Sequence, residues 1–123
     1  MSVKAKENPC AVTTTVSGKE KGLLVETARD LDVPYYTVMR RLVRYILDGK
    51  IDWMELFKQS NELSGADGPG EDDRKFIRTQ LNPELSSAFA QLAEDWGSTT
   101  GIVLRRLMLL YIFGKIPREA IWY

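Results

Sequence analysis

Residues 39–51 read MRRLVRYILDGKI, and sixty-five positions later residues 104–116 read LRRLMLLYIFGKI. The two segments share an arginine pair followed by leucine, and both end in Gly-Lys-Ile. The same spacing extended backwards places Leu24 on Phe89, so the apolar pattern is shared as well. Self-similarity at a fixed period is the mark of repeated structural units. The sequence therefore predicts two diverged copies of one small unit.

The composition is typical of a small globular protein. The chain has 123 residues, of which 44% are hydrophobic and 28% charged, and this is enough for one compact core. Its single cysteine, Cys10, excludes an internal disulfide and fits a reducing compartment. No secretory signal is visible, and the longest apolar run, residues 107–113, is too short to span a bilayer. We expect a cytoplasmic protein that does not enter the membrane.

The net charge of zero conceals an uneven distribution along the chain. Residues 59–73 carry five acidic and no basic side chains, whereas residues 74–123 carry seven basic and four acidic ones. An acidic segment therefore masks a basic second copy. The basic excess is small, so we expect a weak electrostatic affinity for nucleic acid.

Each copy begins with a predicted β-strand. Residues 11–16 (AVTTTV) are rich in β-branched residues, which favour strands, and residues 76–81 (FIRTQL) take the same place in the second copy. Alternate side chains of a strand point to opposite faces, and the apolar ones are expected to face the core. The side chains left on the outer face are Thr13, Thr15, Arg78 and Gln80.

Two helices are predicted after each strand. Ser17 and Glu20 form a capping box that opens a helix in the first copy. Asn82-Pro83 supplies an N-cap followed by a first-turn proline in the second. After a break at Pro34, and again at residues 97–100, an amphipathic stripe predicts the second helix of each copy.

The predicted organisation is a flexible arm, a first copy, an acidic Gly/Pro linker and a second copy. Their bounds are residues 1–10, 11–58, 59–73 and 74–123. A short third helix ends the first copy, and residues 117–123 are expected to form a truncated version of it. One strand with two helices leaves its edges and part of its apolar surface uncovered, so the copies should pair. We expect a mainly α fold with a two-stranded antiparallel ribbon, arranged as an intramolecular pseudo-dimer.

This order of strand, capped helix and second helix resembles the ribbon-helix-helix superfamily, typified by Arc, MetJ and CopG. The resemblance covers residues 11–51 and 76–116 and rests on short apolar patterns. The tandem single-chain layout is similar to that of the conjugative accessory protein TraY. The family implies sequence-specific binding of double-stranded DNA, with the ribbon in the major groove. It also implies a role as a transcriptional regulator, such as a repressor, or as an accessory factor in DNA processing or transfer.

The resemblance implies two sets of DNA contacts. Base contacts fall on the outer strand residues: Arg78 would pair with guanine, Gln80 with adenine, and Thr13 and Thr15 with either base edges or thymine methyl groups. Phosphate contacts fall on the N-terminus of the second helix, where free N–H groups favour an anion. The residues carried over there are Ser98, Thr99 and Thr100 in the second copy, and Tyr35 in the first.

Plainer interpretations stand beside these. Outer strand residues are often only solvated. The arginine pairs at residues 40–41 and 105–106 fit structural ion pairs as well as phosphate contacts. Aromatic residues at helical spacing fit a core better than a base-stacking platform; they are Trp53, Phe57, Trp96 and Trp122.

Nothing in the sequence indicates catalysis. The chain has no histidine, Cys10 has no visible activating partner, and no phosphate-binding glycine motif or zinc-ligand spacing occurs. We expect no catalytic residue, cofactor or metal. Two functions remain: a DNA-binding protein, including self-association along DNA, or a protein-binding module that kept the scaffold and lost the DNA surface.

Overall fold

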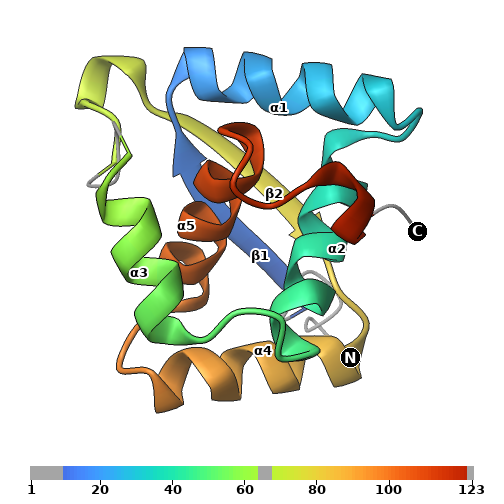
Figure 1. Ribbon diagram of the computed structural model, residues 1–123, viewed down its shortest axis with the longest axis vertical. Coiled ribbons are helices and arrows are strands. Elements are labelled where there is room, and N and C mark those ends of the chain that lie inside the picture. The colour runs from blue at the N-terminus through green and yellow to red at the C-terminus, as the bar shows by residue number, and fades with distance from the viewer. Residues whose placement is uncertain (1–9, 64–67, 122–123) are drawn as a thin grey trace, which may run out of the picture.

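The computed structural model describes residues 10–63 and 68–121. These residues form five α-helices and one two-stranded antiparallel sheet (Figure 1). Most of the predicted arm, and residues 64–67 of the predicted linker, lie outside the described residues. In chain order the elements are β1 (Ala11–Val16), α1 (Gly18–Asp30), α2 (Tyr35–Leu47), α3 (Trp53–Asn61), the 3-10 turn η2 (Glu71–Asp73), β2 (Lys75–Gln80), α4 (Pro83–Asp95), α5 (Thr100–Ile112) and the 3-10 turn η3 (Arg118–Ile121).

The two strands pair with each other, although three α-helices lie between them in the sequence. Ala11 lies opposite Gln80, and the antiparallel register continues from there along both strands. β1 occupies the predicted residues, and the predicted antiparallel pairing is confirmed. β2 begins and ends one residue earlier than predicted. The hydrogen bonding nevertheless continues past its end, because the Leu81 N–H donates to the Cys10 carbonyl at 2.9 Å.

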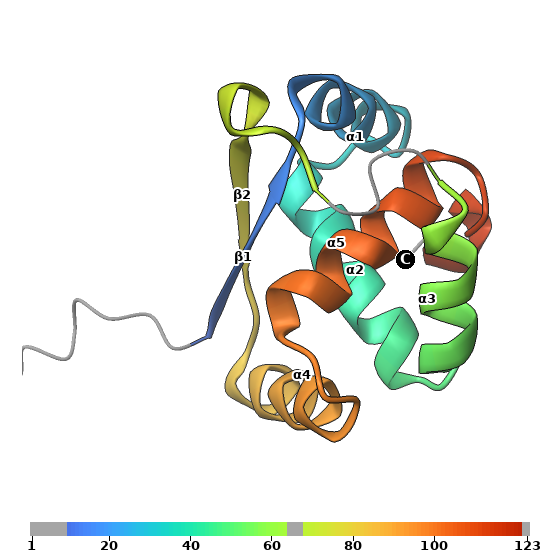
Figure 2. The ribbon, with the colours of Figure 1, turned by 90° about the vertical axis from the view of Figure 1, so that its left-hand side faces the viewer.

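The helices of the described residues all lie on one side of this ribbon (Figure 2). Burial alternates along both strands in agreement with that arrangement. The buried side chains of the strands are Val12, Thr14, Val16, Ile77 and Thr79. The predicted division of the ribbon into an apolar inner face and a polar outer face is therefore confirmed for β1 and for most of β2.

Two threonines on the inner face hold the first turns of α5 and α2 against the ribbon. Thr14 Oγ1 donates to the Gly101 carbonyl at 2.7 Å, and Thr79 Oγ1 donates to the Tyr36 carbonyl at 2.7 Å. Each strand thus holds a helix from the other half of the chain. The approach is close at α5, where a Cβ added to Gly101 would lie 3.0 Å from the Thr13 carbonyl oxygen. Glycine is the residue that permits this contact.

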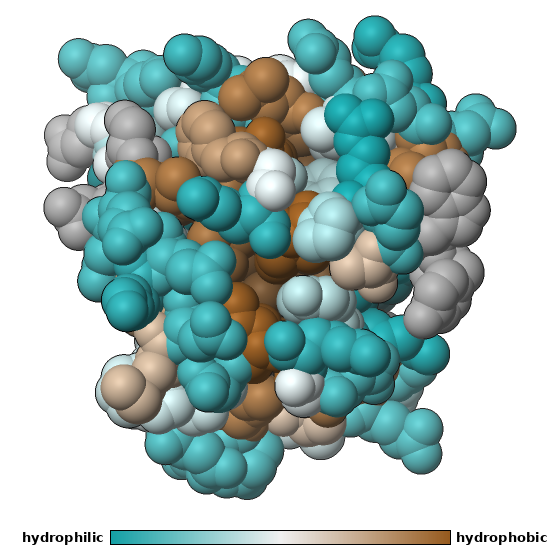
Figure 3. Space-filling model, in the orientation of Figure 1, coloured by the Kyte–Doolittle hydropathy of each residue, from teal (hydrophilic) through white to brown (hydrophobic). Residues whose placement is uncertain are grey.

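Helix α5 runs through the middle of the core. It contacts β1 and each of the other four α-helices, and eight of its thirteen residues are buried. On the face opposite the ribbon, apolar side chains are visible in the middle of a surrounding polar surface (Figure 3). The largest fully buried side chains include Leu24, Met39, Leu42, Ile46, Leu56, Phe89, Leu104 and Leu107.

The helices begin largely where the capping patterns predict. Ser17 Oγ accepts from the Glu20 N–H at 3.1 Å, and Glu20 Oε1 accepts from the Ser17 N–H at 2.9 Å, which completes the capping box. Asn82 caps α4, with Pro83 in its first turn. Pro34 lies at the predicted break and takes the N-cap position of α2, which begins at the next residue.

The two halves repeat each other in backbone detail. α1 and α4 begin and end sixty-five positions apart, as do α2 and α5. The turn after α1 has Asp32 at φ 60°, and the turn after α4 has Gly97 at φ 68°. The turns after α2 and α5 have Gly49 at φ 77° and Gly114 at φ 83°. A residue with left-handed backbone angles therefore follows the corresponding helices at the same place in both halves.

The segment predicted as a linker, residues 59–73, is structured at both ends. α3 continues to Asn61, because Ser60 is fully buried and its hydroxyl donates to a carbonyl of the preceding turn at 2.7 Å. At the other end, Asp73 Oδ1 accepts from the Gly18 N–H at 3.0 Å. A carboxylate at this place satisfies a free donor of α1, a role that the sequence pattern did not indicate.

The aromatic residues only partly follow the prediction that they form core. Phe57 and Trp96 are half-buried and pack against it. Trp53 is 49% exposed at the start of α3, so the prediction is wrong for this residue. Trp122 lies outside the described residues. Within the described ranges, no helix combines the length and the apolar character needed to cross a bilayer.

Candidate functional site

The outer face of the ribbon brings together the four residues predicted as base contacts. Thr13 lies directly opposite Arg78, near the middle of the ribbon. Gln80 lies at one end opposite Ala11, and Thr15 lies towards the other end. Arg78, Gln80 and Thr13 are exposed and Thr15 is half-exposed. The result is a largely polar surface with one guanidinium near its centre.

Phe76 also belongs to this face, and the sequence analysis missed it. It lies opposite Thr15 and is 65% exposed. The signal was the alternation itself, because Phe76 precedes Arg78 by two positions and must share its face. Ala11 lies two positions before Thr13 and shares this face by the same rule.

The start of α5 borders this face. Thr99 is its N-cap and accepts from the Ile102 N–H through its hydroxyl at 3.2 Å. The N–H groups of the next two residues, Thr100 and Gly101, have no acceptor within a helix of this geometry. Thr99 lines a groove of about 440 Å³ together with Thr13 and Thr15. A predicted phosphate contact and two predicted base contacts thus share one groove.

Ser98 and Thr100 lie on the other side of the same helix start. Together with Thr99 they line a hollow of about 680 Å³ between α4 and the first turn of α5. The three predicted phosphate contacts of the second half are therefore adjacent, but only Thr99 also borders the ribbon groove.

The start of α2 is built differently. Pro34 offers no side-chain cap, and Tyr35 is half-buried with its ring 5.9 Å from the Tyr36 ring in an edge-on arrangement. The Lys21 ammonium lies 5.9 Å from the centre of the Tyr35 ring. An ammonium and an aromatic pair therefore stand where the second half has a hydroxyl cap.

One arginine of the second pair, Arg105, has a structural role. Arg105 is buried, and its Nη1 donates to Glu20 Oε1 at 3.0 Å and to the Thr15 carbonyl at 2.7 Å. Its Nη2 donates to Glu20 Oε2 at 3.4 Å. The pair joins α5, the start of α1 and β1, and it neutralises the charge of Arg105. A structural ion pair, one of the two interpretations of these arginines, holds for this residue.

The second arginine of each pair contacts a short helical segment that packs against the helix carrying that arginine. Arg106 Nη1 donates to Ser60 Oγ at 2.9 Å and to Asn61 Oδ1, and its guanidinium lies 5.0 Å from the Phe57 ring centre. Arg41 Nη1 donates to the Ile121 carbonyl at 3.2 Å. Both residues tie a main helix to α3 or η3.

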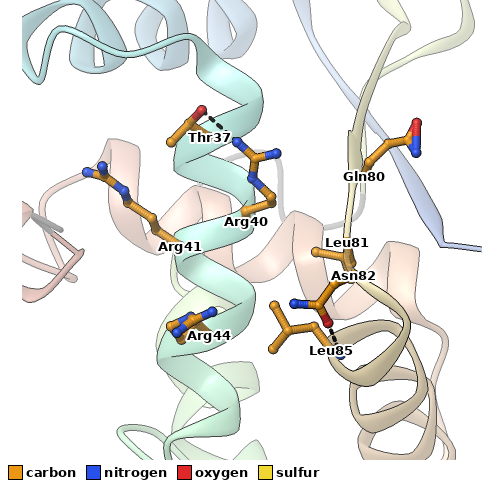
Figure 4. A pocket seen from close by; sticks show the side chains of 8 residues that line it. All are labelled: Thr37, Arg40, Arg41, Arg44, Gln80, Leu81, Asn82 and Leu85. Atoms are coloured by element: carbon orange, nitrogen blue, oxygen red, sulfur yellow. Dashed lines mark hydrogen bonds between the residues drawn. The ribbon is translucent and has the colours of Figure 1, made fainter.

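Arginines of α2 line a groove of about 590 Å³ between α2 and the connection from β2 to α4 (Figure 4). Among the described residues that line it there are three arginines and no carboxylate. Arg41 points away from β2 in this view, whereas Arg40 faces it. The lining residues are Thr37, Arg40, Arg41, Arg44, Gln80, Leu81, Asn82 and Leu85.

Comparison with other proteins adds no assignment. No protein-family model, no curated protein sequence and no solved structure matches the chain. What the site does must therefore be argued from its own residues.

Proposed function

We propose that the chain is a tandem ribbon-helix-helix pseudo-dimer that binds double-stranded DNA. The pseudo-dimer is supported by a relation between its hydrogen bonds. Advancing Thr14 and reversing Gly101 by sixty-five positions gives Thr79 and Tyr36, and both pairs form the same 2.7 Å bond. Applied to the strand register, the same exchange returns five of the six pairs to another pair or to itself, with Thr13 opposite Arg78 at the centre. The sixth pair, Val16 and Lys75, maps onto Cys10 and Leu81, which are joined by the hydrogen bond from the Leu81 N–H to the Cys10 carbonyl.

The observation that carries the DNA proposal is the outer face of the ribbon. In the described part of the chain all helices lie behind the ribbon (Figure 2), so its polar face is open to a ligand. The major groove of B-DNA is about 12 Å wide and admits a two-stranded ribbon. The side chains on this face are of the types that read base edges.

Each of these side chains has a matching base. Arg78 can donate two hydrogen bonds to guanine, and Gln80 can both donate to and accept from adenine. The methyl groups of Thr13 and Thr15 and the ring of Phe76 suit the methyl group of thymine. Since the two strands differ at every outward position, the site read should be asymmetric rather than palindromic.

The start of α5 would add positioning contacts. Its two free N–H groups and the hydroxyl of Thr100 are donors, and the positive end of the helix dipole favours a phosphate. Ser98 and Thr99 extend this donor surface, and Tyr35 supplies a hydroxyl at the first residue of α2. Such contacts fix register on the duplex without selecting a sequence.

The same chemistry serves a repressor and an accessory factor in DNA processing or transfer, because the two differ in where the site lies. Selection of bound duplexes from a random library, followed by footprinting, tests the proposal. We expect enrichment of one asymmetric site. Recovery of unenriched sequence at low salt would contradict sequence-specific binding.

A protein-binding module is the second candidate, and the exposure of Phe76 favours it. An aromatic side chain in the middle of an interface is a common anchor for protein partners. Affinity for random duplex against salt separates the two candidates. A linear fall of log affinity with log salt supports DNA binding, and absence of binding at low salt supports the module.

A further inference from the structure

The arginine groove of the first half has a counterpart in the second half, where the corresponding arginine already has a carboxylate partner. Sixty-five positions separate Arg40 from Arg105, and Glu20 from Leu85. In the second half, the guanidinium of Arg105 is held by the carboxylate of Glu20. In the first half, Leu85 stands where that carboxylate would be, and it lines the groove beside Arg40.

Arg40 therefore lacks the anion that its counterpart has. Its Nη2 donates to Thr37 Oγ1 at 3.0 Å, and its guanidinium lies 5.9 Å from the Tyr36 ring centre. Neither Arg40 nor Arg44 has a carboxylate within ion-pair distance among the described residues. Arg40 is half-buried, so part of its hydration is lost. A partly desolvated guanidinium gains most from a charged acceptor.

Donors predominate among the polar groups that line the groove. Asn82 Oδ1 accepts from the Leu85 N–H at 2.8 Å, so the amide nitrogen of Asn82 is the atom turned towards α2 (Figure 4). Arg40 and Arg44 lie one turn apart on α2, which forms the wall of the groove opposite Asn82 (Figure 4). Two guanidinium groups and an amide N–H around one space suit a tetrahedral oxyanion.

The position of the groove indicates which oxyanion. Gln80 belongs both to the groove lining and to the outer end of the ribbon face. The major groove is bordered by the two phosphate backbones of the DNA, so the ends of a β-ribbon that lies in it come close to backbone phosphates. We propose that Arg40, Arg44 and Asn82 bind a backbone phosphate of the DNA. This inference rests on the proposed DNA binding and adds to it a phosphate contact made by charged side chains of the first half.

Three variants test the groove in two independent ways. Arg40→Gln and Arg44→Gln each remove one positive charge. Leu85→Glu instead rebuilds in the first half the ion pair that Glu20 and Arg105 form in the second. Both Glu20 and Leu85 are the third residue of their helices, so the new glutamate would also complete a capping box with Asn82. Thermal melts should show that all three variants fold.

Arg118→Gln is the matched charge control. Arg118 is in η3, on the side of the molecule away from the ribbon (Figure 2). It forms an exposed ion pair with Asp30, and such pairs contribute little to stability. The control therefore changes the net charge equally without touching the groove.

Binding of a selected and a random duplex is measured against salt for each protein. For each groove variant we expect the slope of log affinity against log salt to fall by about 0.9, and affinity at 0.1 M salt to fall roughly eightfold on both duplexes. The control should keep the wild-type slope. Wild-type slopes in all three groove variants would overturn the groove assignment while leaving DNA binding intact.

A spectroscopic arm separates the two proposals and the two phosphate sources. The Nε–Hε signals of Arg40 and Arg44 are followed by NMR during addition of short duplex, inorganic phosphate or polyglutamate at constant ionic strength. Signal shifts with duplex that disappear in Leu85→Glu would support binding of a DNA backbone phosphate in the groove. Shifts with inorganic phosphate in a protein that does not bind duplex would support an oxyanion site and reject the DNA function. Shifts with polyglutamate alone would overturn the phosphate assignment.

Discussion

At the scale of single residues, the alternation of side chains along the strands and the helix-capping patterns gave most of the correct predictions of residue position. The period of two placed Thr13 and Arg78 on the outer face, because the inner face had to be apolar. The same rule places Phe76 on the outer face, where it is 65% exposed, although the prediction named only the polar side chains there. The buried position of Arg105 had no signal in its own segment, because its partner Glu20 lies far away in the sequence.

Arg78→Ala tests direct readout by one residue. Because a bidentate contact to guanine would be lost, we expect specificity to relax at one base pair, at a cost of about 1–3 kcal/mol there. Competition binding with single-substituted sites measures this. Lys75→Ala is the control, since Lys75 is a basic residue of the same strand but does not share the face of Arg78. An equal loss on every sequence for Arg78→Ala would exclude base readout.

Asp32 and Gly97 form a matched pair for backbone strain. Both have left-handed backbone angles after a helix, and a Cβ added at Gly97 would meet nothing within 4 Å. Gly97→Ala should therefore lower the free energy of unfolding by about 1 kcal/mol through conformation alone. Asp32→Gly should raise it by up to about 1 kcal/mol. Urea denaturation measures both changes. If both variants were as stable as the wild type, backbone strain at these two positions would be contradicted.

At the scale of elements, the sequence predicted both strands and the start of nearly every helix. It predicted the linker less well. α3 extends into it because Ser60 is buried against α5, and Asp73 returns to cap α1. Both contacts depend on tertiary packing, which local composition does not encode. The arginine groove was hidden for the same reason, because its asymmetry depends on residues of two helices and a strand end.

Glu20→Gln tests the ion pair that joins α1, α5 and β1. The amide keeps the capping geometry but leaves the buried charge of Arg105 without a counter-ion. We expect the free energy of unfolding to fall by about 3 kcal/mol in urea denaturation. Asp30→Asn breaks the exposed pair with Arg118 and should cost less than about 1 kcal/mol. Similar losses in both variants would show that burial does not govern the strength of the Glu20–Arg105 pair.

At the scale of the whole molecule, the repeat predicted the mainly helical fold with its antiparallel ribbon. Most contacts between elements join the first half to the second: α5 packs on β1, α2 on β2, and α3 on α5. Neither half has a core of its own. The internal repeat was informative because it required this pairing, whereas composition indicated only a small globular protein.

A chain divided between residues 65 and 66 should therefore fold only as a complex. Each fragment alone would expose one strand edge and the apolar faces of two helices. We expect each to lose most of its helical circular dichroism, and an equimolar mixture to recover it. Sedimentation should then give a one-to-one complex. A fragment that is folded and monomeric by itself would contradict a shared core.

The connection between β1 and β2 through a single polypeptide has a cellular consequence. A ribbon assembled from separate subunits falls apart as its concentration drops, and it can mix with related subunits. Here the tether sets a fixed effective concentration for strand pairing, however dilute the protein is. A cell holding only a few copies would keep every ribbon whole, and no foreign subunit could be exchanged into it.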